Sequence, residues 1–472
     1  MKNKNDKIFI LLFIMLICLV MSWIVEAGVF NSGSFSSVGY YRAGIFDLFA
    51  LVLSAFYYKR YELFYLFLIG GCYGVLTQTK IYRKLVDKTS ALIKGKEPVV
   101  MALITLLMGA YISISNNLLV LLFLSPFIVS VFLRNGYDKI TALSAGFGGI
   151  FIGYLGLTFG LGESQYLYES TGVDILDWMW VKVVLFIAAY VLFTLFAILH
   201  MRKNNEVDET EDDIFCPAPL DETKLKKRQK VKLWPIILVM AIVLVNVLIG
   251  YISWFDSFDI SFFSELHTNF TSAFTIADVP IFYSLLGSYF TGFGEWDSLM
   301  FAMFFLLVGV IVIALISKMK VDDFVKYFGR GMRKISKVAF IFGLSYVLVF
   351  LATSFPWQNT MLNFLFGDGT FNILLLLIIA VIAQIFIGDP SYSAYTFAPY
   401  LAVAYTGSIV ASIILWRLGT GIALVAGPTS FILLSALTYL NVSYKDWLKY
   451  IWKFVLTFVI VSLLVMAIVL YV

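Results

Sequence analysis

The sequence predicts an all-α polytopic membrane protein made of two inverted repeats, each with a re-entrant helical hairpin and a broken helix. Three observations carry this prediction: the composition, the number of long apolar runs, and two regions where apolar sequence is interrupted in matching places. Of the 472 residues, 61% are hydrophobic and 14% are charged, and the mean hydropathy is +0.91. Soluble domains are about 45–50% apolar and about 25% charged, so the solvent of this chain is lipid.

The same composition excludes several classes of protein, namely cytosolic enzymes, secreted domains and disordered chains. The net charge of +4 is too small and too scattered for nucleic-acid binding. The three cysteines, Cys18, Cys72 and Cys216, lack metal-ligand spacing, and the two histidines are far apart in sequence. We therefore expect no catalytic centre, no nucleic-acid partner and no cofactor other than a sodium ion.

Seven uninterrupted apolar runs are long enough to cross a bilayer, which takes roughly 20 residues. The first follows three lysines and continues without a small-residue cleavage site, so we interpret it as a retained span rather than a signal peptide. A shorter run, 44–57, ends in charged residues and is expected to lie along the interface. The seven runs are 8–27, 62–79, 179–200, 233–253, 298–317, 337–353 and 454–472.

Lysine and arginine collect on the cytoplasmic side of membrane proteins and so predict the orientation. With the N-terminus inside, 29 of the 34 basic residues lie in cytoplasmic segments. The outer loops 162–178 and 254–297 hold no basic residue and ten carboxylates. This distribution predicts a cytoplasmic N-terminus and a C-terminus outside. The cytoplasmic segments are 1–7, 80–97, 134–139, 201–232, 318–337 and 441–453.

The chain divides near its middle at the hydrophilic stretch 201–232, which is acidic and then basic and is expected to be a cytoplasmic linker. On either side, scaffold helices precede an interrupted region. The predicted segments are scaffold helices 1–97, first hairpin and broken helix 98–161, outer loop and span 162–200, linker 201–232, scaffold helices 233–353, second hairpin and broken helix 354–440, and a C-terminal span 441–472.

The first interrupted region begins with the apolar run 98–112, which gives way to the polar sequence Ser113-Ile-Ser-Asn-Asn117. A second apolar run, 118–133, follows, and basic residues flank both ends of the pair. We therefore expect a hairpin that enters and leaves on the cytoplasmic side. The glycine-rich helix 140–161 comes next, and Gly156-Leu-Thr-Phe-Gly160 is its expected unwound point.

The second interrupted region has the same plan in the opposite orientation. The run 371–387 meets Gly388-Asp-Pro-Ser-Tyr-Ser393, and the run 394–407 follows. No basic residue occurs from 354 to 407, so this hairpin is expected to open to the outside. The helix 408–440 is expected to be interrupted at Gly419-Thr-Gly421 and again at Gly427-Pro-Thr-Ser430, where proline removes a backbone donor.

Paired units of opposite orientation with interrupted segments at matching positions point to a secondary transporter. Unwound backbone in lipid leaves polar groups unpaired, so it persists only where it lines a cavity or a ligand. The alternative is that these are ordinary glycine and proline kinks, which membrane helices tolerate. One break would favour that alternative, whereas two matching pairs favour transport.

Several motifs lie in order along the chain. They are Gly70-Gly71, Gly136-Tyr137-Asp138, Val321-Asp-Asp-Phe324 with Gly331, Gly427-Pro-Thr-Ser430, and Val442-Ser-Tyr-Lys-Asp-Trp447-Leu-Lys449. Together they resemble a known family, the YfcC-type carriers related to anaerobic dicarboxylate carriers within the ion transporter superfamily. The resemblance implies an elevator-type carrier of organic anions or amino acids, coupled to sodium or protons. It also implies a homodimer in a bacterial cell membrane.

Asp389 and Arg417 are the charged residues placed deepest in apolar sequence, where an ionisable group costs about 2.5–3.5 kcal/mol and therefore indicates function. Arg417 could bind a substrate carboxylate, and Asp389 a cation or a substrate ammonium group. Alternatively, the two residues pair with each other, or Arg417 fixes its helix to a neighbour.

Polar residues at the tips and breaks complete the predicted site. They could bind substrate or form an oxygen cage for sodium, or some could only cap the hairpin helices. The predicted substrate ligands are Asn116, Asn117, Thr158, Asp389, Ser391, Arg417, Thr429 and Ser430, and the predicted ion ligands are Ser113, Ser115, Gly156, Ser393 and Gly427.

Two other classes of function remain open from the sequence. A membrane-embedded enzyme acting on a lipid-linked substrate could use Glu265 and His267 in the long outer loop, although this does not explain the paired hairpins. A scaffold without transport activity would require tips that do not bind ions. The sequence thus favours an ion-coupled carrier of a small organic anion or amino acid.

Overall fold

The computed structural model describes residues 6–31, 34–160, 165–203, 215–220, 231–250, 254–255, 259–295, 298–366 and 371–471. Most of the predicted linker 201–232 lies outside these residues. Within them all regular secondary structure is helical except for two short β-hairpins, which the sequence did not predict. Seven helices of this described part are long and apolar enough to cross a membrane. The coarse prediction of an all-helical polytopic membrane protein is therefore confirmed.

The chain forms two compact units. Unit 1 comprises Met1–Leu63, Thr89–Cys216 and Lys334–Val472, and unit 2 comprises Phe64–Lys88 and Pro217–Arg333. Both predicted hairpin-and-break regions belong to unit 1. Three helices have residues in both units, and they are α3 (Arg60–Leu76), α4 (Lys80–Ile93) and α16 (Val321–Ser345).

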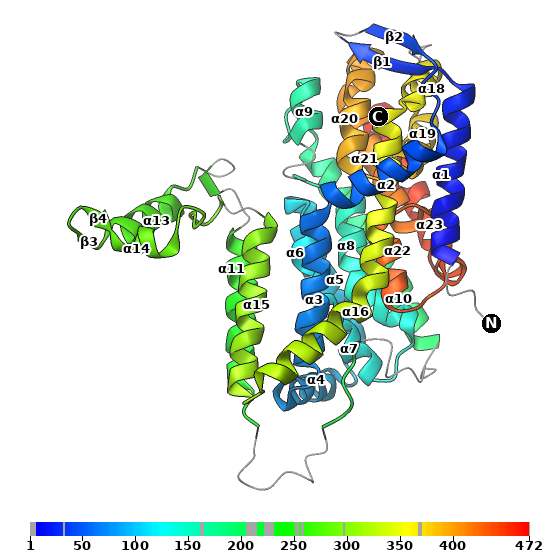
Figure 1. Ribbon diagram of the computed structural model, residues 1–472. Coiled ribbons are helices and arrows are strands. Elements are labelled where there is room, and N and C mark those ends of the chain that lie inside the picture. Colours follow the sequence, from blue (N-terminus) through cyan, green and yellow to red (C-terminus); the bar gives the residue numbers. More distant parts are fainter. Residues whose placement is uncertain are drawn as a thin grey trace. The chain divides into compact units, whose positions relative to one another are not determined.

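Unit 1 carries most of the helices (Figure 1). Its strands β1 (Ala27–Asn31) and β2 (Ser34–Gly39) pair antiparallel. Its helices are α1 (Asp6–Ile24), α2 (Ile45–Tyr58), α5 (Glu97–Ser115), α6 (Leu118–Leu122), α7 (Ser125–Arg134), α8 (Lys139–Leu155), α9 (Gln165–Thr171), α10 (Met179–Lys203), α17 (Val347–Ser354), α18 (Trp357–Phe366), α19 (Ile373–Ile387), α20 (Pro390–Ala404), the 3-10 turn η3 (Thr406–Ser408), α21 (Ile409–Ala426), α22 (Phe431–Tyr439) and α23 (Tyr444–Tyr471).

The first interrupted region consists of α5, α6 and α7 followed by α8. Helix α5 ends at Asn116, which adopts a left-handed conformation at φ 55° and turns the chain. Helix α8 packs closely against α5, since a Cβ on Gly149 would lie 2.5 Å from Cβ of Met108. The helix stops at Gly156, and Gly160 has a φ of 55°. The structure therefore contains the break that the sequence predicts at 156–160.

The second interrupted region consists of α19 and α20 followed by α21 and α22. Gly388, at φ 84°, ends α19 and Pro390 begins α20. The predicted interruption at Gly419–Gly421 is wrong, because α21 runs continuously from Ile409 to Ala426. These glycines instead allow close helix packing: a Cβ on Gly419 would lie 2.4 Å from that of Ala380, and a Cβ on Gly421 2.6 Å from the carbonyl oxygen of Tyr154. The second predicted break, at 427–430, is present.

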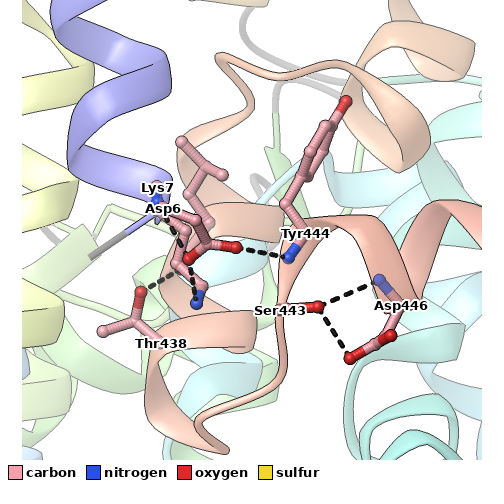
Figure 2. Close-up of polar contacts among 7 residues, drawn as sticks. Asp6, Lys7, Thr438, Ser443, Tyr444 and Asp446 are labelled. Carbon is pink, nitrogen blue, oxygen red and sulfur yellow. Dashed lines mark hydrogen bonds and ion pairs between the residues drawn. The ribbon is translucent and has the colours of Figure 1, made fainter. Parts of the chain in front are cut away.

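Segments predicted on the same side of the membrane meet within unit 1. Figure 2 shows Asp6 at the start of α1 accepting a hydrogen bond of 2.9 Å from the backbone N–H of Tyr444 at the start of α23. Both segments are predicted to be cytoplasmic. At the other end of α1, Asn359 of α18 donates to the carbonyl oxygen of Gly28 in β1 at 2.9 Å. Both of these residues belong to stretches predicted on the outer side.

Unit 2 contains α11 (Trp234–Gly250), α13 (Phe262–Ser272), α14 (Ile281–Leu286) and α15 (Ser298–Ile316), with the two-residue strands β3 (Thr275–Ile276) and β4 (Val279–Pro280). Helices α11 and α15 pack together. The first half of α16 approaches α3 at glycines, where a Cβ on Gly74 would lie 2.4 Å from the carbonyl oxygen of Tyr327. Such close packing through small residues is typical of helices in lipid.

Candidate cationic site at the first helix break

Ser113 at the end of α5 holds the first break in place. Its hydroxyl donates to the carbonyl oxygen of Gly156 at 2.5 Å and accepts from the backbone N–H of Thr158 at 3.0 Å. The carbonyl oxygen of Ser113 also accepts from the N–H groups of Thr158 and Gly160, both at 3.1 Å. The hairpin tip therefore satisfies backbone groups that the end of α8 leaves open.

The other predicted residues of the first tip have local contacts. Ser115 donates to the carbonyl oxygen of Tyr111 within its own helix at 2.7 Å. Asn116 is 8% exposed, and its carbonyl oxygen accepts from the Tyr154 hydroxyl at 3.4 Å. Asn117 precedes α6 without a side-chain capping bond. The structure joins two predicted residues, Ser113 and Thr158, by a side-chain contact of 3.0 Å between their hydroxyl oxygens.

At the second tip, Asp389 caps its own helix. One carboxylate oxygen accepts from the N–H of Tyr392 at 2.9 Å, and the other from the hydroxyl of Tyr346 at 3.0 Å. Ser391 lies half-buried in the first turn of α20. Ser393 is fully buried, and its hydroxyl has no hydrogen-bond partner among the described residues.

The second break is held by its neighbours. Thr429 donates to the carbonyl oxygen of Ile385 in α19 at 2.7 Å, and Ser430 to that of Leu424 at 2.6 Å. Ser430 also caps α22, accepting from the N–H of Leu433 at 3.2 Å. From α23, Tyr444 donates to the carbonyl oxygen of Ala426 at 2.6 Å. Gly427 ends α21 next to these contacts.

Arg417 lies in the middle of α21 and is 7% exposed. Its Nη1 donates to the hydroxyl of Tyr168 in α9. Its Nε and Nη2 are buried without a partner among the described residues. Asp389 is engaged elsewhere, so the pairing of Asp389 with Arg417 that the sequence left open is not formed in the described structure.

A second buried cation, Lys182 in the first turn of α10, lies beside the same tyrosine. It is 3% exposed and donates to the carbonyl oxygen of Ile175 at 2.6 Å. The centre of the Tyr168 ring lies 4.7 Å from Nζ of Lys182 and 5.5 Å from Cζ of Arg417. Lys182 and Arg417 also line one small cavity together with Leu155, Gly156, Leu185 and Leu418.

The two cations dominate the electrostatics of this cavity, which we call the cationic site. Burial alone would raise the pKa of the Tyr168 phenol, but the positive charges of Arg417 and Lys182 outweigh burial and lower this pKa below its usual value. No described carboxylate forms an ion pair with either cation within 4.0 Å. Buried positive charge without a counter-charge favours the binding of an anion.

Sequence reasoning identified Arg417 but missed Lys182 and Tyr168. A signal for Lys182 was available, because it is one of the five basic residues outside the predicted cytoplasmic segments and lies inside the run 179–200. Tyr168 gave no such signal, since a tyrosine in an outer loop is expected at a membrane interface. Among the described residues, no group of three His, Cys, Asp or Glu side chains could hold a metal ion.

The fold and the site together define a polytopic membrane protein with a buried, positively charged site beside a helix break. The chain belongs to the DcuC family of C4-dicarboxylate anaerobic carriers, whose sequence profile matches residues 5–471. The resemblance noted from the motifs is thereby confirmed. Family membership makes the chain a carrier rather than an enzyme, and a multi-pass membrane protein.

Two solved structures are similar over almost the whole chain. The YdaH transporter of Alcanivorax borkumensis is 13% identical with a TM-score of 0.42, over 98% of both chains. MtrF of Neisseria gonorrhoeae, described as one of a class of antimetabolite efflux pumps, is 12% identical with a TM-score of 0.36, over 98% of this chain and 94% of its own. No curated protein matches the sequence.

Proposed function

We propose that the protein is an ion-coupled secondary transporter of a C4-dicarboxylate, with Arg417 binding a substrate carboxylate. The observation that carries this proposal is the buried guanidinium whose Nε and Nη2 have no partner among the described residues. A guanidinium forms bidentate hydrogen bonds with a carboxylate, and these bonds are strongest where water is excluded. The family name supports the same class of substrate.

An organic anion fits the site better than an amino acid does. A bound ammonium group would need an acceptor or an anion beside it, whereas the site presents two cations. Asp389, the carboxylate considered for this role, already accepts from Tyr346 and Tyr392. The amino-acid alternative is therefore the weaker one.

An elevator mechanism, inverted repeats and a homodimer are part of this proposal. The order of elements supports the inverted repeats, since each interrupted region has a hairpin followed by a helix that ends at a glycine. The elevator mechanism and the homodimer are what the resemblance to the carrier family implies. In this interpretation, unit 1 carries the substrate site. The proposed orientation has the N-terminus in the cytoplasm and the C-terminus outside, as the distribution of basic residues predicts.

Ion coupling rests on the oxygen-rich tips and breaks. Ser393 is the best-supported candidate for a sodium ligand because its buried hydroxyl has no partner among the described residues. Asn116, Asn117, Ser115, Ser391 and the carbonyl groups at Gly156 and Gly427 remain candidates. Sodium that binds the folded protein should raise its apparent melting temperature in detergent, compared with potassium at the same concentration.

Uptake by the purified full-length chain in proteoliposomes tests the function. We expect radiolabelled succinate to accumulate under an inward sodium gradient or an inward proton gradient, or to exchange with internal succinate. Failure of succinate and fumarate to accumulate or exchange under all of these conditions would contradict the proposal.

Arg417→Gln removes the charge and tests the residue. We expect uptake at low succinate concentration to fall by about 100-fold, because a charge-assisted bidentate pair in a buried site contributes about 3 kcal/mol. Arg60→Gln is the matched control, since Arg60 is exposed and its guanidinium donates to the carbonyl oxygen of Tyr57. Normal uptake by folded Arg417→Gln protein would remove this residue from the substrate site.

A further inference from the structure

The proposed function assigns one substrate carboxylate to Arg417 and leaves the buried cation Lys182 without a role. The Lys182 residue is 3% exposed, and a lysine in such a place normally has a partner of opposite charge. Its hydrogen bond to the Ile175 carbonyl oxygen supplies an acceptor but no negative charge. Asp177 acts on it electrostatically but does not come within ion-pair distance.

Lys182 and Arg417 come from different helices, α10 and α21, and converge on one side chain. Both cationic groups lie within 5.5 Å of the centre of the Tyr168 ring, and both line the cavity beside Gly156. One small molecule can therefore contact both. Mutual repulsion of two buried cations is costly unless a group of negative charge lies between them.

Tyr168 occupies this position in the structure. Its hydroxyl accepts from Arg417, and its ring face lies against both cations. The remaining cavity is about 10 Å³, enough for about one water molecule and too small for a dicarboxylate. Tyr168 belongs to the seven-residue helix α9, which packs against α20 of the second hairpin. A dicarboxylate can therefore contact both cations only if neighbouring side chains move, and Tyr168 is the side chain that contacts both of them.

We propose that Lys182 and Arg417 each bind one carboxylate of the same dianion, and that Tyr168 fills the space between them when no substrate is bound. This inference rests on the proposed function and assigns the second carboxylate of the substrate to Lys182. Lys182 is thereby a specificity-determining residue. A monoanion leaves one of the two cations without a counter-charge and binds more weakly.

Competition with wild-type protein tests the inference without any substitution. Succinamate has the shape of succinate, but a neutral amide replaces one carboxylate. In proteoliposomes at neutral pH, we expect succinamate to inhibit radiolabelled succinate uptake at least about 10-fold more weakly than unlabelled succinate does, the loss of one charge-assisted contact. Equal potency of the two compounds would overturn the inference. Uptake of succinate itself would still support the proposed function.

Lys182→Gln tests the residue. We expect the half-saturation concentration for succinate to rise at least about 10-fold while the potency of succinamate changes by less than about twofold, so that discrimination is lost. Lys182→Arg should retain discrimination, and Lys453→Gln on the exposed face of α23 is the matched control. An equal loss for both compounds would make Lys182 a structural residue only. If Lys182→Gln does not fold, the wild-type competition decides.

Tyr168→Phe tests whether the Tyr168 hydroxyl takes the place of the substrate or contacts it. The phenylalanine keeps the ring but removes the hydroxyl that Arg417 donates to. Since substrate no longer competes with that hydroxyl, we expect the half-saturation concentration for succinate to fall by about threefold or more. A rise would mean that the hydroxyl contacts substrate, and would overturn its role as an internal substitute.

Discussion

The two helix breaks of unit 1 are built differently, although they follow the same order of elements. At the first break, a serine from the hairpin tip donates to Gly156, and Gly156 lines the cationic site. At the second break, the contacts come from Thr429, Ser430 and Tyr444, which bond to backbone carbonyl groups of the surrounding helices. The first break thus borders the proposed substrate site. The second break is fixed by hydrogen bonds to α19 and α21 and from α23.

This difference means that the two breaks contribute unequally to the cationic site. The first break supplies unwound backbone at Gly156, whereas Arg417 comes from an unbroken stretch of α21 and Lys182 comes from α10. Helices α8 and α21 approach closely because Gly421 lies against the backbone of Tyr154 and Leu155. A substitution at the first break should therefore alter both stability and transport, and one at the second should alter stability alone.

Among substitutions at the two breaks, the largest effect is expected from Ser113→Ala. It leaves the buried carbonyl oxygen of Gly156 without its hydroxyl donor, whereas the N–H of Thr158 keeps the backbone carbonyl of Ser113 as acceptor. We expect a stability loss of about 1–3 kcal/mol and a fall in succinate uptake of about 10-fold, because the wall of the cationic site shifts. Melting in detergent and proteoliposome uptake measure the two effects.

Ser462→Ala is the matched control for this experiment. Ser462 is fully buried in α23, and its hydroxyl bonds back to the carbonyl oxygen of Phe458 in the same helix, so removing it should change stability by less than about 0.5 kcal/mol. If Ser462→Ala impaired uptake as much as Ser113→Ala, the loss would follow from removing any buried hydroxyl, and the specific link between Ser113 and the first break would be refuted.

Tyr444→Phe is the corresponding test at the second break. It removes the hydroxyl that donates to the carbonyl oxygen of Ala426, and we expect a stability loss of about 1–3 kcal/mol. The half-saturation concentration for succinate should stay within about twofold, because no part of the cationic site moves. Tyr57→Phe, at a side chain that is 72% exposed, should change neither quantity. A large rise in half-saturation concentration for Tyr444→Phe would make the two breaks equivalent.

Local sequence signals predicted most of the helices, although α16 and α23 begin at Val321 and Tyr444, well before the predicted runs 337–353 and 454–472. The breaks at 156–160 and 427–430 were predictable because glycine and proline act on the backbone of their own segment. The segment Gly419–Gly421 has a similar glycine-rich sequence but lies within a continuous helix. Its glycines allow close packing against Ala380 and Tyr154. Whether a glycine breaks a helix or lets another helix approach depends on residues that are distant in sequence.

The cationic site was predictable only in part for the same reason. Arg417 stands out as a charge in apolar sequence, whereas its partner in the site, Lys182, is separated from it by 235 positions of chain. No local pattern indicates that α10 and α21 bring these side chains to one tyrosine. The sequence also suggested tip residues as ligands, yet Asp389 and Ser430 cap helices in the structure. Charge and burial identify candidates, but packing between distant helices decides which ones converge.

The smallest expected effect concerns the helix that leads to the first break. Asp138 caps α8 by accepting from the N–H of Thr141 at 3.1 Å, and its other oxygen lies 3.2 Å from Nε2 of His200. Burial raises the pKa of this carboxyl group, but the contacts with His200 and Thr141 outweigh burial and lower its pKa below the usual value. The charged form therefore stabilises the folded protein.

Because the pKa in the folded protein is lowered, this stabilisation is fully present above the unfolded value of about 4 and is lost as the pH falls through the folded value. Asp138→Asn keeps a capping side chain but no charge, so we expect a loss of about 1 kcal/mol or less at neutral pH. Melting curves of the variant and the wild type should converge below about pH 4. Ser430→Ala, at the uncharged cap after the second break, should show a loss that does not vary with pH. A constant gap between Asp138→Asn and wild type would mean that the carboxylate charge adds nothing to the cap.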